Sequence, residues 1–291
     1  MSGWKAFNLT GGIMTVKVVT DSSADLPPPL IKELGVTIVP LYVRFGEKTY
    51  RDRVDISDDE FYRRLQYDPV HPNTVQPTPN DFAEIYRKLS QDADGIISIH
   101  ISSKLSGTCN SALQGKELVE NGCPIEVIDS QTTTMGLGLV DMVAAKAAKA
   151  GKGLPEVVEE VKHTIPKIHL VFLLDTLKYL LLGGRIGKGK ALLGSILNVK
   201  PMLAIKDGEV MPVGQVRTRA KGIGRLIDFV KSATDVQGLA VGYNTTPDEA
   251  QAMHECLGSV FSKDKIILSK IGPLLGVHAG PGALGVTFRE G

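Results

Sequence analysis

The stretch Ser102-Ser103-Lys104-Leu105-Ser106-Gly107-Thr108-Cys109-Asn110-Ser111 lies at the centre of the predicted fold. It follows the run Gly95 to Ile101, which is rich in β-branched residues and predicts a buried strand. Ala112 to Val119 then predicts a helix. A strand that ends on hydroxyl residues and enters a helix gathers backbone N–H groups and hydroxyls at one point, which suits a carboxylate or phosphate. Helix capping by Ser and Thr explains the same residues, and it is the favoured interpretation when this stretch is considered alone.

Predicted strands and helices alternate on both sides of this stretch, as in a parallel α/β layer structure. We therefore expect residues 14–165 to form an N-terminal α/β domain with a parallel sheet, preceded by a disordered extension over residues 1–13. The predicted strands are Val16–Val19, Val36–Phe45 with a hairpin return at Thr49–Tyr50, Gly95–Ile101 and Ile125–Ile128. The first predicted helix is short and ends at Leu34. The others span Ser57–Gln66, Thr78–Leu89, Ala112–Val119, Met135–Ala150 and Leu154–Thr164.

A second domain of mixed α/β structure is expected over residues 166–291. Asp207-Gly208 separates two apolar runs, and Asp-Gly is a strong hairpin signal. The predicted strands are Ile168–Leu174, Val199–Ile205, Val210–Val216, Leu239–Tyr243, Lys265–Leu268 and Gly285–Arg289, with helices ending at Leu182 and spanning Lys221–Val230 and Pro247–Leu257. No low-complexity linker separates the two halves, so we expect the domains to pack closely.

The composition of the chain argues against several classes of protein. Hydrophobic residues make up 43% of the 291 residues and charged residues 22%, as in soluble globular proteins. A net charge of +1 and an aromatic content of 5% argue against a nucleic-acid partner. The longest uncharged stretch, Ile271–Phe288, is too rich in Gly and Pro for a membrane helix. The three cysteines are scattered and the N-terminus lacks the pattern of a signal peptide, so we expect a cytoplasmic protein without a metal site.

Two glycine-rich segments resemble nucleotide-binding loops but lack residues that such loops need. Gly280–Gly285 matches G-x-G-x-x-G, yet too few residues follow it to form the helix that holds a pyrophosphate. Gly184–Lys190 nearly matches a P-loop, but Ala191 stands where a hydroxyl must bind Mg²⁺. His278 lies between glycines with little room for a helix, and on its own it is equally well explained as a packed side chain or as a ligand group.

Separate segments spread over the chain from about Met14 resemble the DegV family. In the first half these are Thr20–Leu26, Thr74–Thr78, Ser102–Thr108 and Asp129-Ser130, and in the second half Tyr179–Ile186, Asn198–Pro201 and Gly276–Gly285. Each segment alone is weakly specific, but their joint order and spacing are highly specific.

The resemblance implies a two-domain DegV-like fold that binds a long-chain fatty acid between its domains and has no catalytic activity or cofactor of its own. It implies that Thr74 and Ser106 hydrogen-bond the carboxylate and that His278 completes the site. Gly107 is then part of the site, and Arg185 lies nearby. It also implies that the bound carboxylate is presented to a fatty-acid kinase, which makes an acyl-phosphate. We expect a monomer.

This chain departs from the family pattern at two positions. Val75 stands where the family often has Ser, and Ala279 where it often has Thr. Both departures remove a hydroxyl close to the expected head group, so a smaller polar network is expected.

An enzyme is the alternative to a lipid carrier. It is either a hydrolase that uses Ser106 with His278, or a phosphoryl-transfer protein that uses the turn Gly183–Lys190. A third possibility is an interaction module that binds an acidic partner through Arg217 and Arg219.

Overall fold

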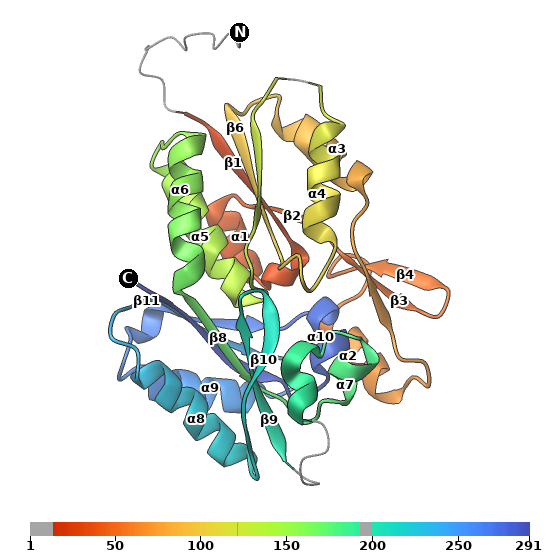
Figure 1. Ribbon diagram of the computed structural model, residues 1–291, viewed down its shortest axis with the longest axis vertical. Coiled ribbons are helices and arrows are strands. Elements are labelled where there is room, and N and C mark those ends of the chain that lie inside the picture. The colour runs from red at the N-terminus through yellow and green to blue at the C-terminus, as the bar shows by residue number, and fades with distance from the viewer. Residues whose placement is uncertain (1–13, 121, 193–198) are drawn as a thin grey trace.

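The strands form two large sheets and one small sheet (Figure 1). This architecture comes from a computed structural model that describes residues 14–120, 122–192 and 199–291. The extension predicted over residues 1–13 and the motif residue Asn198 lie outside the described residues. We call residues 14–164 the N-terminal part and residues 168–291 the C-terminal part. The α/β class and the parallel sheet expected in the first part are confirmed.

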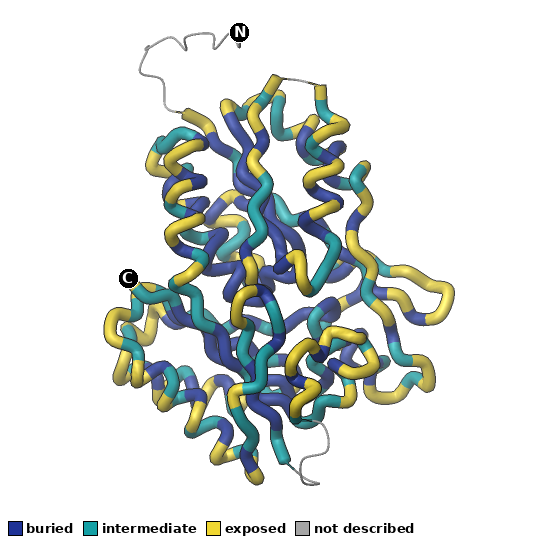
Figure 2. The backbone as a smooth tube through the Cα atoms, viewed as in Figure 1, coloured by how far each residue is buried: buried dark blue, intermediate teal, exposed yellow. Residues whose placement is uncertain are grey.

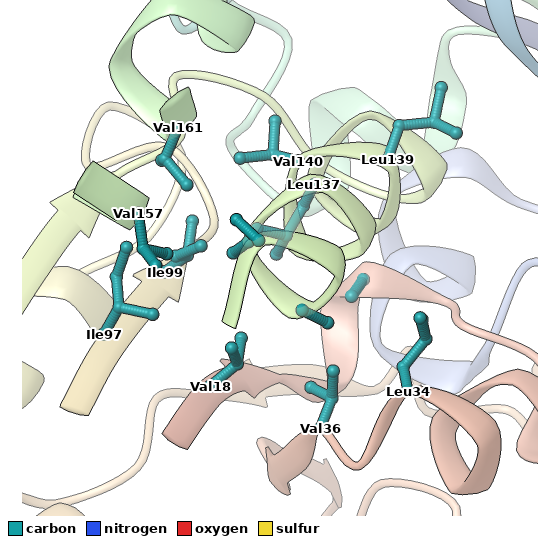
Figure 3. Packing of buried hydrophobic residues seen from close by; sticks show 14 of the residues in the cluster. Val18, Leu34, Val36, Ile97, Ile99, Leu137, Leu139, Val140, Val157 and Val161 are labelled. Atoms are coloured by element: carbon teal, nitrogen blue, oxygen red, sulfur yellow. The ribbon is translucent and has the colours of Figure 1, made fainter. Parts of the chain in front are cut away.

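A parallel sheet organises the N-terminal part. Across it, the strands are β2 (Thr37–Val39), β1 (Val16–Asp21), β6 (Gly95–His100) and β7 (Ile125–Asp129). Its helices are α1 (Pro28–Leu34), α5 (Met135–Lys149) and α6 (Leu154–Thr164) on one face, and α3 (Pro79–Leu89) and α4 (Thr108–Glu117) on the other. Because side chains alternate along a strand, Ile97 and Ile99 pack with Val157 of α6, whereas Ile96 packs with Phe82 of α3. Figure 3 shows the first of these two cores.

A mixed sheet organises the C-terminal part. Its strands, in order across it, are β10 (Glu209–Val216), β9 (Lys200–Lys206), β8 (Ile168–Leu173), β13 (Leu284–Glu290), β11 (Val236–Tyr243) and β12 (Ile266–Lys270). Only β11 and β12 of these pair in parallel, joined through α9 (Pro247–Leu257). Together with α8 (Arg219–Lys231), α9 covers one face. Gly222 allows α8 to approach strand β8 closely, since a Cβ at Gly222 would lie 2.5 Å from the side chain of Leu173.

A small antiparallel sheet extends from the N-terminal part toward the C-terminal part. Its strands, in order, are β4 (Lys48–Arg51), β3 (Tyr42–Phe45) and β5 (Asn73–Val75). The helices beside it are α2 (Asp58–Tyr67), α7 (Lys178–Leu182) and α10 (Pro273–Ala279) (Figure 1). Val277 of α10 packs with Val43 of β3 and Phe61 of α2, so a helix from the end of the chain is docked on the N-terminal part.

The two parts share a buried contact. The chain passes from α6 to β8 through a 3-10 turn, η2 (Ile165–Lys167). Leu139 of α5 packs with Ala240 of β11, so α5 belongs to the core of one sheet and also covers part of the other. Figure 2 shows the buried residues along both sheets and where the two parts meet. The bounds of two domains at residues 165 and 166 stay a prediction. No helix of the described residues is long and apolar enough to span a bilayer.

Several predicted elements are wrong in extent. Val36–Phe45 is two strands in two sheets, because Pro40 lacks the N–H that would continue one ladder. The helix predicted from Ala112 begins earlier, at Thr108. Thr74 lies on strand β5, which is absent from the predicted strands, and His278 lies on helix α10, where no helix was expected.

Candidate functional site

An apolar cavity lies between the two large sheets. Leu170 and Phe172 of β8 face it, and they alternate with Val171 and Leu173, which pack under α8 and α9. The opposite wall comes from segments after the parallel strands, including Ile101. Helix α10 and the end of β12 complete the wall with Ile271, Leu274, Leu275, His278 and Ala279.

Four of the five predicted site residues line this cavity: Thr74, Ser106, Arg185 and His278. The Oγ1 of Thr74 lies 3.1 Å from the Nε2 of His278, so a hydrogen bond joins β5 to α10 across 204 residues of sequence. These residues are the polar end of a cavity whose other walls are largely aliphatic. Such a cavity suits a ligand with one polar end and a long apolar body.

The imidazole of His278 is neutral at pH 7. Burial lowers the pKa of His278 to about 3, and the positive charges of Arg185 and His71 act in the same direction. Its Nδ1 has no hydrogen-bond partner among the described residues. Because an unpaired buried N–H is rarer than an unpaired acceptor, we assign the proton to Nε2, which donates to the Oγ1 of Thr74. The hydroxyl hydrogen of Thr74 is then available to a carboxylate in the cavity.

Ser106 and Gly107 lie in the turn before α4. The Oγ of Ser106 accepts a hydrogen bond from the backbone N–H of Thr108 at 3.3 Å and lies 2.8 Å from the Oγ1 of Thr108. Gly107 does not line the apolar cavity but lines an adjacent hollow. A Cβ at Gly107 would lie 2.7 Å from the Cδ of Gln76, so glycine allows this loop to approach the residue that follows β5 closely.

Arg185 joins the two parts at the polar end of the cavity. Its Nη1 donates to the carbonyl of Gly183 at 2.8 Å, and its Nε donates to the carbonyl of Leu105 in the N-terminal part at 3.3 Å. The adjacent hollow shares Leu105, Ser106, Arg185 and Val210 with the apolar cavity. Lys104, Lys188 and Glu209 also line it, and Glu209 pairs with both lysines, so the polar end of the cavity adjoins a charged surface hollow.

The contacts do not form the pair that a hydrolase would need. The Oγ of Ser106 contacts Thr108, and the Nε2 of His278 contacts Thr74, whereas a nucleophile and its base must contact each other. Arg219 also differs from the expected free basic edge. It lies 2.6 Å from a carboxylate oxygen of Glu249 and 3.2 Å from one of Asp175, so its charge is compensated within the C-terminal part.

The wall of the cavity was not identified from the sequence. Phe172, Ile205 and Leu274 have the residue types and spacing of ordinary core positions. Only the arrangement of the two sheets leaves space beside them. Both departures from the family pattern lie near the polar end: Ala279 lines the cavity, and Val75 follows Thr74 on β5 and is exposed.

Known proteins resemble the chain over nearly its whole length. A family model described as an uncharacterised protein of the DegV family matches residues 15–291. A DegV domain-containing protein of Caldanaerobacter subterraneus is 38% identical over 279 residues, which cover 94% of this chain and 99% of the relative. A solved structure described as fatty acid binding of a DegV family protein from Thermus thermophilus is 32% identical, covers 95% of this chain and 100% of that chain, and has a TM-score of 0.87. A solved structure described as a stearic acid-binding protein from Eubacterium ventriosum is 29% identical. It covers 94% of this chain and 98% of that chain, and has a TM-score of 0.86. With a family model that spans residues 15–291 and relatives matched from end to end, the chain belongs to the DegV family.

Proposed function

We propose that this protein binds one long-chain fatty acid, with the carboxylate at Thr74, Ser106 and His278 and the acyl chain in the apolar cavity. Arg185 contributes positive charge at the same end, and Gly107 shapes the loop beside it. The observation that carries the proposal is the cavity itself, which is largely apolar and has Thr74, Ser106, Arg185 and His278 among its lining residues. Two solved relatives described as binding fatty acids support the choice of ligand.

The energetics of such a complex favour a long chain. Each buried CH₂ contributes roughly 0.8 kcal/mol, so the acyl chain provides most of the affinity. A hydrogen bond to the charged carboxylate adds about 1.5–3 kcal/mol. The head group therefore orients the ligand, while the length of the chain sets the affinity.

We further propose that the protein is a cytoplasmic, monomeric carrier without enzymatic activity or cofactor, which presents the carboxylate to a fatty-acid kinase. The charged surface hollow beside Ser106 and Arg185, which adjoins the polar end of the cavity, supports this role. A carboxylate at the polar end of the cavity would lie next to that hollow, where a phosphate donor held by the partner can approach it.

The identity of the ligand is tested by extracting the purified protein with organic solvent and analysing the extract by mass spectrometry. We expect a saturated or monounsaturated long-chain fatty acid in about equimolar amount. Extracts that are repeatedly empty after mild purification, together with no uptake of added stearic acid, would contradict the proposal.

The polar end is tested by calorimetry of delipidated variants with stearic acid. Thr74→Val keeps the shape of the side chain and removes the hydroxyl, so affinity should fall about tenfold or more. Thr49→Val is the matched control, because Thr49 lies on the other neighbour of β3 and is exposed. Equal affinities of the two variants would show that Thr74 does not contact the carboxylate.

A further inference from the structure

The buried carboxylate of Asp25 connects two walls of the apolar cavity. Its Oδ2 accepts a hydrogen bond from the Oγ1 of Thr134 at 2.8 Å, and Thr134 lines the cavity from the N-terminal part. Its Oδ1 accepts a hydrogen bond from the backbone N–H of Gly272 at 2.9 Å, directly before α10. The side chain of Asp25 is only 1% exposed, so both bonds are shielded from water.

Arg53 completes this connection. Its Nη2 lies 3.4 Å from the Oδ1 of Asp25 and donates to the carbonyl of Lys270, at the end of β12. Its Nε donates to the Oδ1 of Asp58 at 3.1 Å. One guanidinium therefore holds a carboxylate and a helix of the N-terminal part against the segment of the C-terminal part that leads into α10.

The backbone around this connection adopts an unfavourable conformation. Asp25, Arg53 and Thr134 have φ angles of 52°, 58° and 46°. They are three of the five non-glycine residues with positive φ in the described chain. A positive φ is a genuine outlier for a β-branched residue such as Thr134 and costs about 1–3 kcal/mol. Contacts from both parts hold these residues in place.

We infer that Asp25 and Arg53 are positioning residues that hold α10 at a fixed distance from the opposite wall and thereby determine which acyl chains the cavity accepts. Leu274 and Leu275 of α10 are the side chains through which this acts, because both line the cavity. The inference rests on the proposed function and adds residues that contact neither the head group nor the apolar cavity.

The charges in this cluster explain why both residues are needed. Burial raises the pKa of Asp25 to about 6, whereas the charge of Arg53 opposes that rise. Without Arg53, a charged Asp25 would be buried without a compensating cation, which is strongly unfavourable. The carboxylate would then become protonated or move, and Gly272 would lose its acceptor.

The test compares the affinities of delipidated protein for myristic acid and stearic acid by calorimetry, in Asp25→Asn, Arg53→Met and Arg53→Lys. Both ligands carry the same head group, so the ratio of their dissociation constants reports the shape of the cavity. We expect this ratio to change about threefold or more in Asp25→Asn and Arg53→Met, and to return partly toward the wild-type value in Arg53→Lys. General destabilisation weakens both ligands equally and leaves the ratio unchanged.

Arg51→Met is the matched control, because Arg51 lies two residues earlier and its exposed guanidinium pairs with Asp55. Its ratio should equal that of the wild type. Ratios unchanged in Asp25→Asn and Arg53→Met would overturn the inference even if both affinities fell together. If Arg53→Met does not fold, the near-isosteric Asp25→Asn decides the question. Wild-type protein that binds neither acid would refute the proposed function itself, which separates the two failures.

Discussion

Gly183 and His278 are in direct contact, and this contact makes the position of the imidazole sensitive to one methyl group. A Cβ on Gly183 would lie 2.7 Å from the Cε1 of His278 and closer still to its Nδ1. Gly183→Ala should therefore displace the imidazole and lower affinity for stearic acid about tenfold or more, as measured by calorimetry. In Gly224→Ala, where no atom lies within 4 Å of the new Cβ, affinity should not change. Similar affinities in both variants would show that the place of His278 is not critical.

Asp52 should make the stability of the protein depend on pH. Its carboxyl is buried, and this burial raises its pKa to about 7 although a hydrogen bond from Ser22 and the charge of Arg53 act in the opposite direction. Because the folded pKa lies above the unfolded value of 3.8, this carboxyl stabilises the fold at low pH and loses that contribution as pH rises through 7. Asp52→Asn removes the effect. From pH 5 to pH 8, the free energy of unfolding of the variant should rise relative to wild type by on the order of 2 kcal/mol, as measured with urea. Parallel pH profiles would contradict this.

Some of these residues could be identified from the sequence, and others could not. Thr74, Ser106 and His278 were proposed from their place in family motifs, and they line one cavity. The contacts of Asp25 could not be foreseen, because an Asp after a strand is also a common turn residue. Its partner Gly272 lies 247 residues away, and only the assembled fold brings the two together.

Helices and strands were predictable where local signals determine them. Helix α3 begins and ends as predicted, because Thr78 and Asp81 form a capping box and Pro79 occupies the first turn. Helix α10 also begins with a proline, Pro273, but it is short, contains glycine and has no side-chain cap, so it was missed. It is held by tertiary contacts instead: Gly276 lies against Phe61, and the hydroxyl of Tyr62 donates to the carbonyl of Ile271 at 2.9 Å.

The cap of α3 gives a stability prediction that is separate from ligand binding. The Oγ1 of Thr78 accepts a hydrogen bond from the backbone N–H of Asp81 at 3.2 Å. Thr78→Ala should lower the free energy of unfolding by about 1 kcal/mol, and Thr78→Ser, which keeps the hydroxyl, should lower it less. Neither variant should alter affinity for stearic acid, because α3 does not line the cavity. A loss of affinity in Thr78→Ala with stability unchanged would contradict this assignment.

The cavity is a property of the whole molecule. One wall follows the carboxyl ends of the parallel strands, the other is the face of the mixed sheet opposite α8 and α9, and α10 closes the polar end. The two-sheet architecture was predictable from the alternation of strands and helices together with the family motifs. The space between the sheets was not, because a residue that lines a cavity and a residue that fills a core have the same pattern in the sequence.

A crystal structure of the protein with a fatty acid brominated at its methyl end tests the central claim most directly. The anomalous signal of bromine locates the end of the chain, and the electron density locates the carboxylate. We expect the carboxylate within hydrogen-bond distance of Thr74 and Ser106 and the bromine inside the cavity lined by Phe172 and Leu274. A carboxylate away from these hydroxyls, or bromine outside the cavity, would contradict the account.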